Sequence, residues 1–361
     1  SDRTNGLPLE EETIAEVFKT NGYRTAAIGK WHLGSRDEQH PNNRGFDLFY
    51  GMKAGGRDYF YNEKKSDRPG DERNLLLNDR QVKFEKYLTD AFSEKAVEFI
   101  NESSQPFMMY LAYNAVHTPM QATDEDMAKF EGHPRQKLAA MTYALDRGVG
   151  TVIRGLKDSG KFDNTLIFFL SDNGGATTNQ SSNYPLKGFK GNKFEGGHRV
   201  PYFVVWKNGI PAGKPYDGLV SSLDIFATAI DAASISKTRN RLDGVSLLPY
   251  LKGKKGEPHK VLYWRKMDTR AIRSGDYKLI ITHGVDSVLY NIRRDPEEMN
   301  NLINKEPDLY RKLAKKLAKW EKNECIEPSW LEEGWRKITN RYHQQLMHNE
   351  IKTAQDLYKR K

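Results

Sequence analysis

A short apolar run that ends abruptly in polar and glycine residues most constrains how this chain can fold. Residues 166–170 read LIFFL, and residues 171–175 read SDNGG. A wholly apolar run of this length is typical of a strand that is buried on both faces, as in parallel sheets covered by helices. In such sheets ligands bind at the carboxyl ends of the strands. The pattern therefore places Asp172 and Asn173 at a ligand-binding edge, although the same residue types also form ordinary turns.

Alternating strand and helix patterns over residues 1–253 predict an α/β domain with a mostly parallel sheet sandwiched by helices. After Gly253 the pattern changes to short strands and then a basic helix, which predicts a C-terminal antiparallel-sheet-plus-helix subdomain at 254–323 and a helical tail at 324–361. The expected strands are 23–28, 107–112, 166–170, 202–206, 262–265, 271–282 and 287–292. The expected helices are 10–21, a helix capped by Thr89 or Asp90 that runs to residue 101, 135–159, 224–233 and 306–322.

The overall composition limits the class of protein. The 361 residues are 37% hydrophobic and 29% charged, which indicates a globular chain. The net charge of +9 suits an acidic substrate, but lysine-rich surface helices explain it equally well. The sequence contains no interleaved basic and aromatic motif of the kind that binds nucleic acid. No apolar run approaches the roughly 18 residues of a membrane span. The single cysteine, Cys325, excludes an internal disulfide.

Three more segments place reactive side chains at predicted strand ends. Lys30 and His32 lie in GKWHLG directly after strand 23–28, and His117 lies in NAVHTP directly after strand 107–112. Lys190 lies in the glycine- and lysine-rich loop at 185–201. Lysines supply point charges for a tetrahedral oxyanion, and histidines move protons near neutral pH. With a hard cation such as calcium or magnesium on Asp172 and Asn173, this set suits hydrolysis of a sulfate or phosphate ester.

Each of these residues also has a structural interpretation. The His32 ring could pack beside Trp31, and His117 could cap a turn. Lys187 is expected to be structural or on the surface, one of Lys190 and Lys193 could be merely solvated, and His198 could line the pocket or support its loop. The polar stretch 36–86 is expected to be a solvent loop rather than a sugar-binding rim formed by Arg57, Tyr59, Phe60 and Tyr61.

Taken in order, these segments resemble the type I, arylsulfatase-like sulfatases of the alkaline phosphatase superfamily. The similarity begins at GLPLEEETIAEVFKTNGYRTAAIGKWHLG and continues through RGFDLFYG, YLTDAFSEKAVEFI and YLAYNAVHTP. It extends to SSLDIFATAIDAA, LDGVSLLPYL and the SGDYKLI region. GKWHLG, SDNGG and the KGFKG to EGG loop are specific as a set, whereas SDNGG alone would be a weak signal.

The resemblance implies a sulfuric-ester hydrolase that uses formylglycine as nucleophile and one calcium ion. Asp172 and Asn173 are then calcium ligands, and Lys30 and Lys190 bind the sulfate. His117 protonates the leaving alcohol, aided by Lys190, and His32 assists the formylglycine hydroxyls. His198 is included among the substrate-binding candidates. The implied substrate is a sulfated small molecule or glycan, and the implied location is periplasmic or secreted.

The family's paired aspartates and its C/S-x-P-x-R nucleophile motif do not occur in these 361 residues. Cys325 lies in NECIEPSW, which only superficially echoes that motif. We therefore expect the nucleophile in a missing N-terminal segment of the same protein, and no turnover by these residues alone. Two other functions stay open at this point: a related metal-dependent phosphoesterase or phosphonate hydrolase, and a catalytically dead relative that binds sulfated glycans.

Overall fold

The computed structural model describes residues 6–236, 238–325 and 333–359, and these form two compact units. Unit 1 comprises residues up to 166 together with 205–214 and 221–252. Unit 2 comprises residues 167–204, 215–220 and the chain from 253 onward. One boundary between the units, at residues 252 and 253, lies next to the predicted boundary at Gly253. Residues 167–204, however, group with the C-terminal part of the chain. Sequence periodicity does not report this grouping, because it depends on packing between distant segments.

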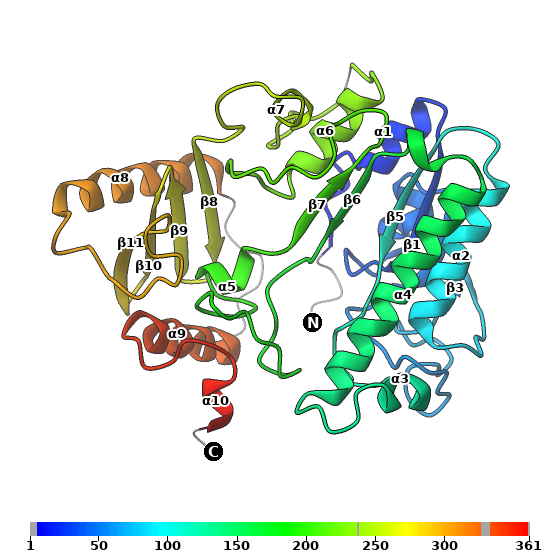
Figure 1. The fold of residues 1–361 in the computed structure, drawn as a ribbon, viewed down its shortest axis with the longest axis horizontal. Coiled ribbons are helices and arrows are strands. Elements are labelled where there is room, and N and C mark those ends of the chain that lie inside the picture. Colours follow the sequence, from blue (N-terminus) through cyan, green and yellow to red (C-terminus); the bar gives the residue numbers. More distant parts are fainter. Residues whose placement is uncertain (1–5, 237, 326–332, 360–361) are drawn as a thin grey trace. The chain divides into compact units, whose positions relative to one another are not determined.

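Unit 1 is built on a five-stranded sheet of order β4-β3-β2-β1-β5 (Figure 1). Strand β1 (Arg24–Lys30) pairs in parallel with β2 (Leu48–Met52) and with β5 (Phe107–Ala112). The short strand β3 (Leu76–Leu77) pairs antiparallel with β2, and β4 (Arg80–Gln81) pairs antiparallel with β3. Lys30 is therefore the last residue of a central strand, and His117 follows the carboxyl end of its neighbour.

Helices cover both faces of this sheet. Helix α1 (Ile14–Thr20) begins at a capping box between Thr13 and Glu16, and its Ala15 packs with Ala27 and Phe49. On the opposite face the Phe92 ring of α2 (Leu88–Glu102) meets Tyr50 edge-on, with the ring centroids 6.0 Å apart. Helix α4 (Gln136–Asp158) packs on α2. The remaining short helices described in or beside this unit are η1 (Asp37–Gln39), η2 (Pro41–Arg44), α3 (Asp124–Ala128), η3 (Phe162–Asn164), α6 (Asp224–Ala232) and α7 (Leu248–Leu251).

Unit 2 contains an antiparallel sheet of order β11-β10-β9-β8. Its strands are β8 (Val261–Lys266), β9 (Thr269–Ser274), β10 (Tyr277–Thr282) and β11 (Asp286–Asn291). Helix α8 (Pro307–Glu324) covers one face with Leu313 and Leu317. The other face packs against Phe189, against α9 (Glu333–Met347) and against the segment that leads to α10 (Asp356–Lys359). Two further strands, β6 (Ile167–Leu170) and β7 (Tyr202–Val205), form a separate sheet, and the loop between them contains α5 (Glu195–His198).

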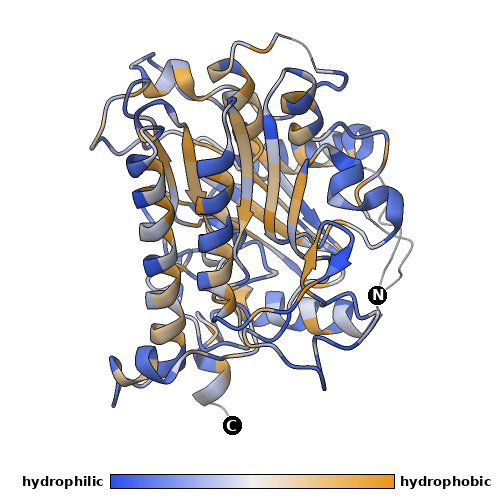
Figure 2. Ribbon diagram, turned by 90° about the vertical axis from the view of Figure 1, so that its right-hand side faces the viewer, coloured by the Kyte–Doolittle hydropathy of each residue, from blue (hydrophilic) through white to orange (hydrophobic). Residues whose placement is uncertain are grey.

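The predicted fold class, an α/β sheet with a C-terminal antiparallel sheet and helix, is confirmed. Figure 2 shows the matching hydropathy pattern, with apolar residues concentrated on the strands and polar residues on the loops and outer helix surfaces. None of the helices in the described part of the chain combines the length and apolar character of a membrane span.

Four local predictions were wrong. The run at 166–170 forms strand β6, but that strand is not buried on both faces, because it lies in a two-stranded sheet and Phe169 is exposed. Tyr87, not Thr89 or Asp90, is the N-cap of α2, and Thr89 is buried inside the helix. The expected strand 271–282 is two strands, because Gly275, at φ +55°, turns the chain between β9 and β10. The stretch 36–86 contains strand β2 and a buried polar network rather than a solvent loop.

Candidate functional site

In unit 1 the two predicted histidines lie beside the same pair of glycines. A Cβ atom on Gly55 would come within 2.6 Å of His32 Cε1, and one on Gly56 within 3.4 Å of His117 Nδ1. Gly55 therefore cannot carry a side chain while the His32 ring stays in place. Lys30 ends the strand that leads to His32, so the structure brings three of the predicted residues to one edge of the sheet. Trp31 is buried, whereas the His32 ring beside it is exposed, so His32 is not a packed core ring.

His117 has a defined hydrogen-bonding arrangement. Its Nδ1 lies 2.8 Å from the carbonyl oxygen of Thr118. A carbonyl oxygen only accepts, so Nδ1 carries the proton and donates it, and we assign the tautomer on that basis. In the neutral ring Nε2 is then the nitrogen that gains and loses a proton. This geometry suits a general acid or base acting through Nε2.

Tyr59 supports the loop that carries His117. Its hydroxyl lies 2.7 Å from the carbonyl oxygen of Asn114 and 2.9 Å from that of His117, so the hydroxyl donates to the turn itself. The Tyr59 side chain is completely buried and its ring stacks on Tyr87, with centroids 5.3 Å apart. Burial raises the pKa of Tyr59 well above its ordinary value, so the hydroxyl stays a donor at every physiological pH.

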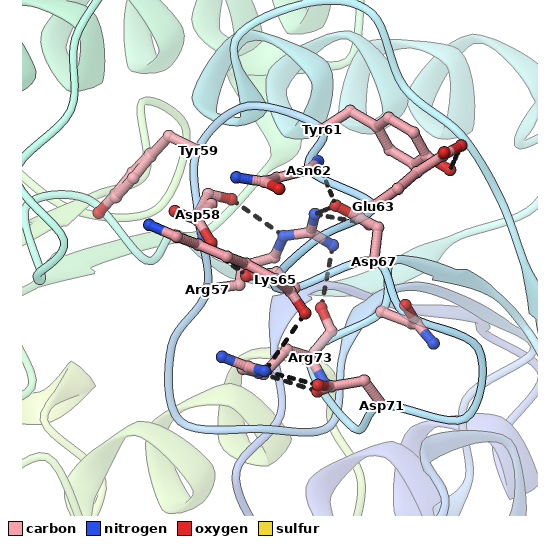
Figure 3. A network of polar contacts seen from close by, with 12 residues as sticks. Arg57, Asp58, Tyr59, Tyr61, Asn62, Glu63, Lys65, Asp67, Asp71 and Arg73 are labelled. Atoms are coloured by element: carbon pink, nitrogen blue, oxygen red, sulfur yellow. Dashed lines mark hydrogen bonds and ion pairs between the residues drawn. The ribbon is translucent and has the colours of Figure 1, made fainter.

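A buried ion pair organises the segment next to these glycines. Arg57 Nη2 donates to both carboxylate oxygens of Asp67, at 2.8 and 2.7 Å, and both side chains are 0% exposed. Figure 3 shows the Arg57 guanidinium at the centre of the network, which also includes a 2.9 Å bond to the carbonyl oxygen of Arg73. The guanidinium additionally lies 4.7 Å from the Phe84 ring centroid. With Nε donating to the Asp58 carbonyl oxygen at 3.0 Å, all three nitrogens of this buried cation are hydrogen-bonded to protein groups.

The neighbouring Asp58 ties the same segment to the chain beyond His117. Its carboxylate accepts from Ser66 Oγ at 2.6 Å and from Gln121 Nε2 at 2.9 Å. Burial alone would raise the pKa of Asp58, but these hydrogen bonds outweigh it and hold that pKa below its usual range. Sequence reasoning missed this network. The signal that could have found it is the Gly55-Gly56 pair, which follows the short apolar run of β2.

In unit 2 the SDNGG turn packs against the loop that carries Lys190. Gly174 N–H donates to the Gly197 carbonyl at 3.0 Å, and Lys190 N–H donates to the Gly175 carbonyl at 3.0 Å. A Cβ atom on Gly174 would lie 1.8 Å from the Gly196 carbonyl oxygen, so the two turns approach as closely as backbone allows. Asp172, Asn173 and Lys190 therefore belong to one loop cluster, and the Lys190 side chain is exposed.

The predicted metal ligands are only part of a cation site. Asp172 is exposed and Asn173 half-buried, and both present oxygen donors of the kind that calcium and magnesium prefer. Calcium takes about six to eight oxygen ligands. No group of three or more His, Cys, Asp or Glu side chains in the described residues could hold a metal ion. The donor type fits, but two side chains are too few, so we derive no reaction step through a metal.

His198 and Lys187 support the loop. The His198 ring packs 4.5 Å from Trp264, and its Nε2 donates to the Lys193 carbonyl at 3.1 Å. Burial and then the Lys278 charge lower the pKa of His198 to about 3, so the ring is neutral. Lys187 is completely buried and donates to the Glu298 carbonyl at 3.0 Å and to Asn349. Of the alternatives for His198, this geometry favours support of the loop.

A buried network fixes the end of this loop to the antiparallel sheet. Lys278 Nζ lies 2.8 Å from the Glu195 carboxylate and 2.9 Å from that of Glu298. Glu195 N–H donates to Glu298 at 2.6 Å. Burial disfavours the charged form of Glu195, but the Lys278 ammonium outweighs it and lowers the pKa of Glu195 to about 2. Burial dominates at Glu298 and raises the pKa of that carboxyl to about 7.

Comparison with known proteins identifies the relatives of this chain. The profile of the Sulfatase family matches residues 1–235, and that of the N-sulphoglucosamine sulphohydrolase C-terminal domain matches residues 190–323. The chain belongs to the sulfatase family. It is 37% identical over 297 residues to the uncharacterized sulfatase YdeN of Escherichia coli (strain K12), covering 73% of this chain and 51% of YdeN.

Other sulfatases show the same partial coverage. The chain is 31% identical to the N-acetylgalactosamine-6-sulfatase of Canis lupus familiaris, covering 76% of this chain and 55% of that enzyme. It thus spans about half the length of these curated relatives. A crystal structure described as Ps i-CgsB in complex with k-i-k-neocarrahexaose is 35% identical, with a TM-score of 0.83 over 93% of this chain and 80% of that one.

Proposed function

We propose that this chain forms most of the sulfate-ester site of a carbohydrate sulfatase. The observation that carries the proposal is the placing of His32 and His117 against Gly55-Gly56, at the strand ends that also deliver Lys30. Membership of the sulfatase family supports the reaction class. The similarity to a structure that holds a neocarrahexaose supports a glycan substrate.

In this proposal each residue has one task. Lys30 and Lys190 neutralise charge on the sulfate oxygens, which develops further as the ester bond breaks. His117, with Nδ1–H held by Thr118, acts in its doubly protonated form, donates the Nε2 proton to the leaving sugar oxygen and is left neutral with its proton on Nδ1. His32 would exchange a proton with the hydroxyl groups of the formylglycine nucleophile that the family implies. His198 is outside this set because its Nε2 is engaged by Lys193.

Two chemical groups are implied by the family rather than present in these residues. A calcium ion would withdraw charge from the sulfate, and we propose Asp172 and Asn173 as two of its ligands. A formylglycine aldehyde hydrate would supply the nucleophile, and the 361 residues contain no C/S-x-P-x-R motif from which to make one. We therefore propose that these residues bind a sulfate ester but do not turn it over. A periplasmic or secreted location is proposed on the same family grounds.

A glycan-binding protein without activity is the second candidate, favoured by the absence of that motif. Titration with 4-nitrophenyl sulfate and 4-nitrophenyl phosphate, followed by assay of nitrophenol release, separates a sulfate-ester site from a phosphoesterase site. The sulfate ester is expected to bind, with at least tenfold weaker binding in Lys30→Ala, and no release is expected. Release by the isolated chain would contradict the expected inactivity. Preference for the phosphate ester together with stoichiometric zinc would favour a phosphoesterase instead.

A further inference from the structure

Lysines from two distant elements of unit 2 lie side by side next to the Lys190 loop. Lys266, at the end of β8, places its Nζ 3.1 Å from the position of a Cβ atom on Gly191, the residue after Lys190. Lys193 follows two residues later in the same loop. Lys266 and Lys193 are both half-buried, whereas Lys190 is exposed. The Lys266 ammonium therefore reaches the turn at Gly191, and Lys190 and Lys193 lie one residue before and two residues after that glycine.

The register of β8 explains why Lys266 reaches this loop. Side chains two residues apart share one face of a strand, so Lys266 lies on the same face as Trp264. Trp264 packs on His198, and His198 in turn donates to the Lys193 carbonyl. The loop from Lys190 to His198 therefore lies on the face of β8 from which Lys266 projects.

The three charges have no acidic partner within the described residues. Several other buried or half-buried cations of unit 2 pair with a carboxylate, including Lys278 with Glu195, Arg270 with Glu321 and Arg336 with Asp268. Lys187 instead donates to a carbonyl and to an amide oxygen. No such ion pair forms at Lys190, Lys193 or Lys266 in the part of the chain that the structure describes. Burial, and then the charge of Lys266, lower the pKa of Lys193 to about 8. Burial and the charge of Lys190 likewise lower the pKa of Lys266.

The buried histidine of α9 that interacts with Lys193 and Lys266 adds no negative charge. His343 of α9 is completely buried, and its Nδ1 lies 2.8 Å from the Thr339 carbonyl oxygen. Its Nε2 has no hydrogen-bond partner among the described residues. Burial is the main cause that lowers the pKa of His343 to about 4, with Lys193 and Lys266 contributing, so the ring is neutral. The three lysine cations therefore keep their net positive charge beside a neutral histidine. That net charge is large enough to attract more than one anion.

We propose that Lys190, Lys193 and Lys266 bind two sulfate groups of one glycan: Lys190 the ester to be cleaved, and Lys193 with Lys266 a second sulfate on the same or the adjoining sugar. This inference rests on the proposed function and narrows its substrate class to multiply sulfated saccharides. A second anion would offset the repulsion between the half-buried ammonium groups, and a singly sulfated sugar would leave that repulsion in place.

Calorimetric titration of the full chain with two neocarrabiose disaccharides, carrying one or two sulfate groups, tests the inference at a fixed salt concentration. The wild-type chain is expected to bind the disulfated sugar at least tenfold more tightly. Lys266→Met is expected to reduce that preference below about threefold and to leave affinity for the monosulfated sugar within about twofold. Lys316→Met, at an exposed lysine of α8, is the matched control and should change neither affinity.

Lys266→Arg guards against a change in folding, because it keeps the charge and is expected to keep most of the preference. A preference that survives Lys266→Met, or is lost equally in Lys266→Arg, would overturn the inference. If both sugars bind the wild type equally and Lys266→Met has no effect, the inference fails and the proposed function stands. If neither sugar binds the folded wild-type chain, both fail.

Discussion

The Arg57–Asp67 ion pair offers a sharp test of how unit 1 is held together. Asp67→Asn keeps the size of the side chain but removes the charge that faces the Arg57 guanidinium. Both side chains are 0% exposed, so solvent cannot take over the lost interaction. Removing one partner of a buried pair leaves the other charge uncompensated and costs about 3–5 kcal/mol. For a domain of this size that corresponds to a fall in melting temperature of roughly 6–20 °C.

The assay is thermal and urea unfolding of the variant beside a surface control. Glu63→Gln breaks the Lys83–Glu63 pair, whose side chains are 74% and 63% exposed, and is expected to leave the unfolding midpoints nearly unchanged because solvent screens that pair. The double variant Arg57→Met/Asp67→Leu removes both charges and is expected to recover most of the loss. The reasoning is refuted if Asp67→Asn costs no more than Glu63→Gln.

Three further predictions concern residues that hold the His117 loop of unit 1 and the SDNGG and Lys190 loops of unit 2 in place. Tyr59→Phe removes the donor to two carbonyls and is expected to cost about 1–3 kcal/mol in urea unfolding and to shift the His117 imidazole NMR signals, whereas Tyr61→Phe should do neither. Gly174→Ala should destabilise the chain and expose the SDNGG turn to hydrogen exchange. The control Gly150→Ala in α4 meets only the flexible Arg154 side chain and should be neutral or stabilising. Equal effects of the two substitutions would contradict the close approach of Gly174 to Gly196. Glu298 holds a proton in the folded chain up to about pH 7 but releases it near 4.5 when unfolded, so stability should fall as pH rises between these values. Glu298→Gln should remove up to about 3 kcal/mol of that pH dependence in urea midpoints, and an unchanged dependence would contradict the assignment.

Local patterns in the sequence were sufficient for elements whose residues interact with near neighbours. Strand 107–112 was predicted with the bounds of β5, and helix 135–159 differs from α4 by one residue at each end. In both, the spacing of apolar residues along the element itself carries the information. Strand β2 was missed because its five residues stand between polar segments, and its place beside β1 depends on pairing with a distant strand.

Contacts between distant residues explain what the sequence could not supply at the candidate site. The polar stretch 36–86 looks solvated, but Arg57 and Asp67 within it are buried because they neutralise each other. Lys187 is buried because Glu298 and Asn349, far along the chain, accept its hydrogen bonds. The order of strand ends, by contrast, was enough to group Lys30 with His32, and Asp172 with Asn173, since a strand end is a local feature.

A double-mutant cycle on sulfate-ester binding tests most directly whether Lys30 and Lys190 bind the same anion, as the proposed function requires. Affinity for 4-nitrophenyl sulfate would be measured for the wild type, Lys30→Ala, Lys190→Ala and the double variant. If both lysines bind the same sulfate, the two losses should differ from additivity by about 0.5–3 kcal/mol. Losses that add within about 0.3–0.5 kcal/mol, or no loss in either single variant, would contradict a shared sulfate site.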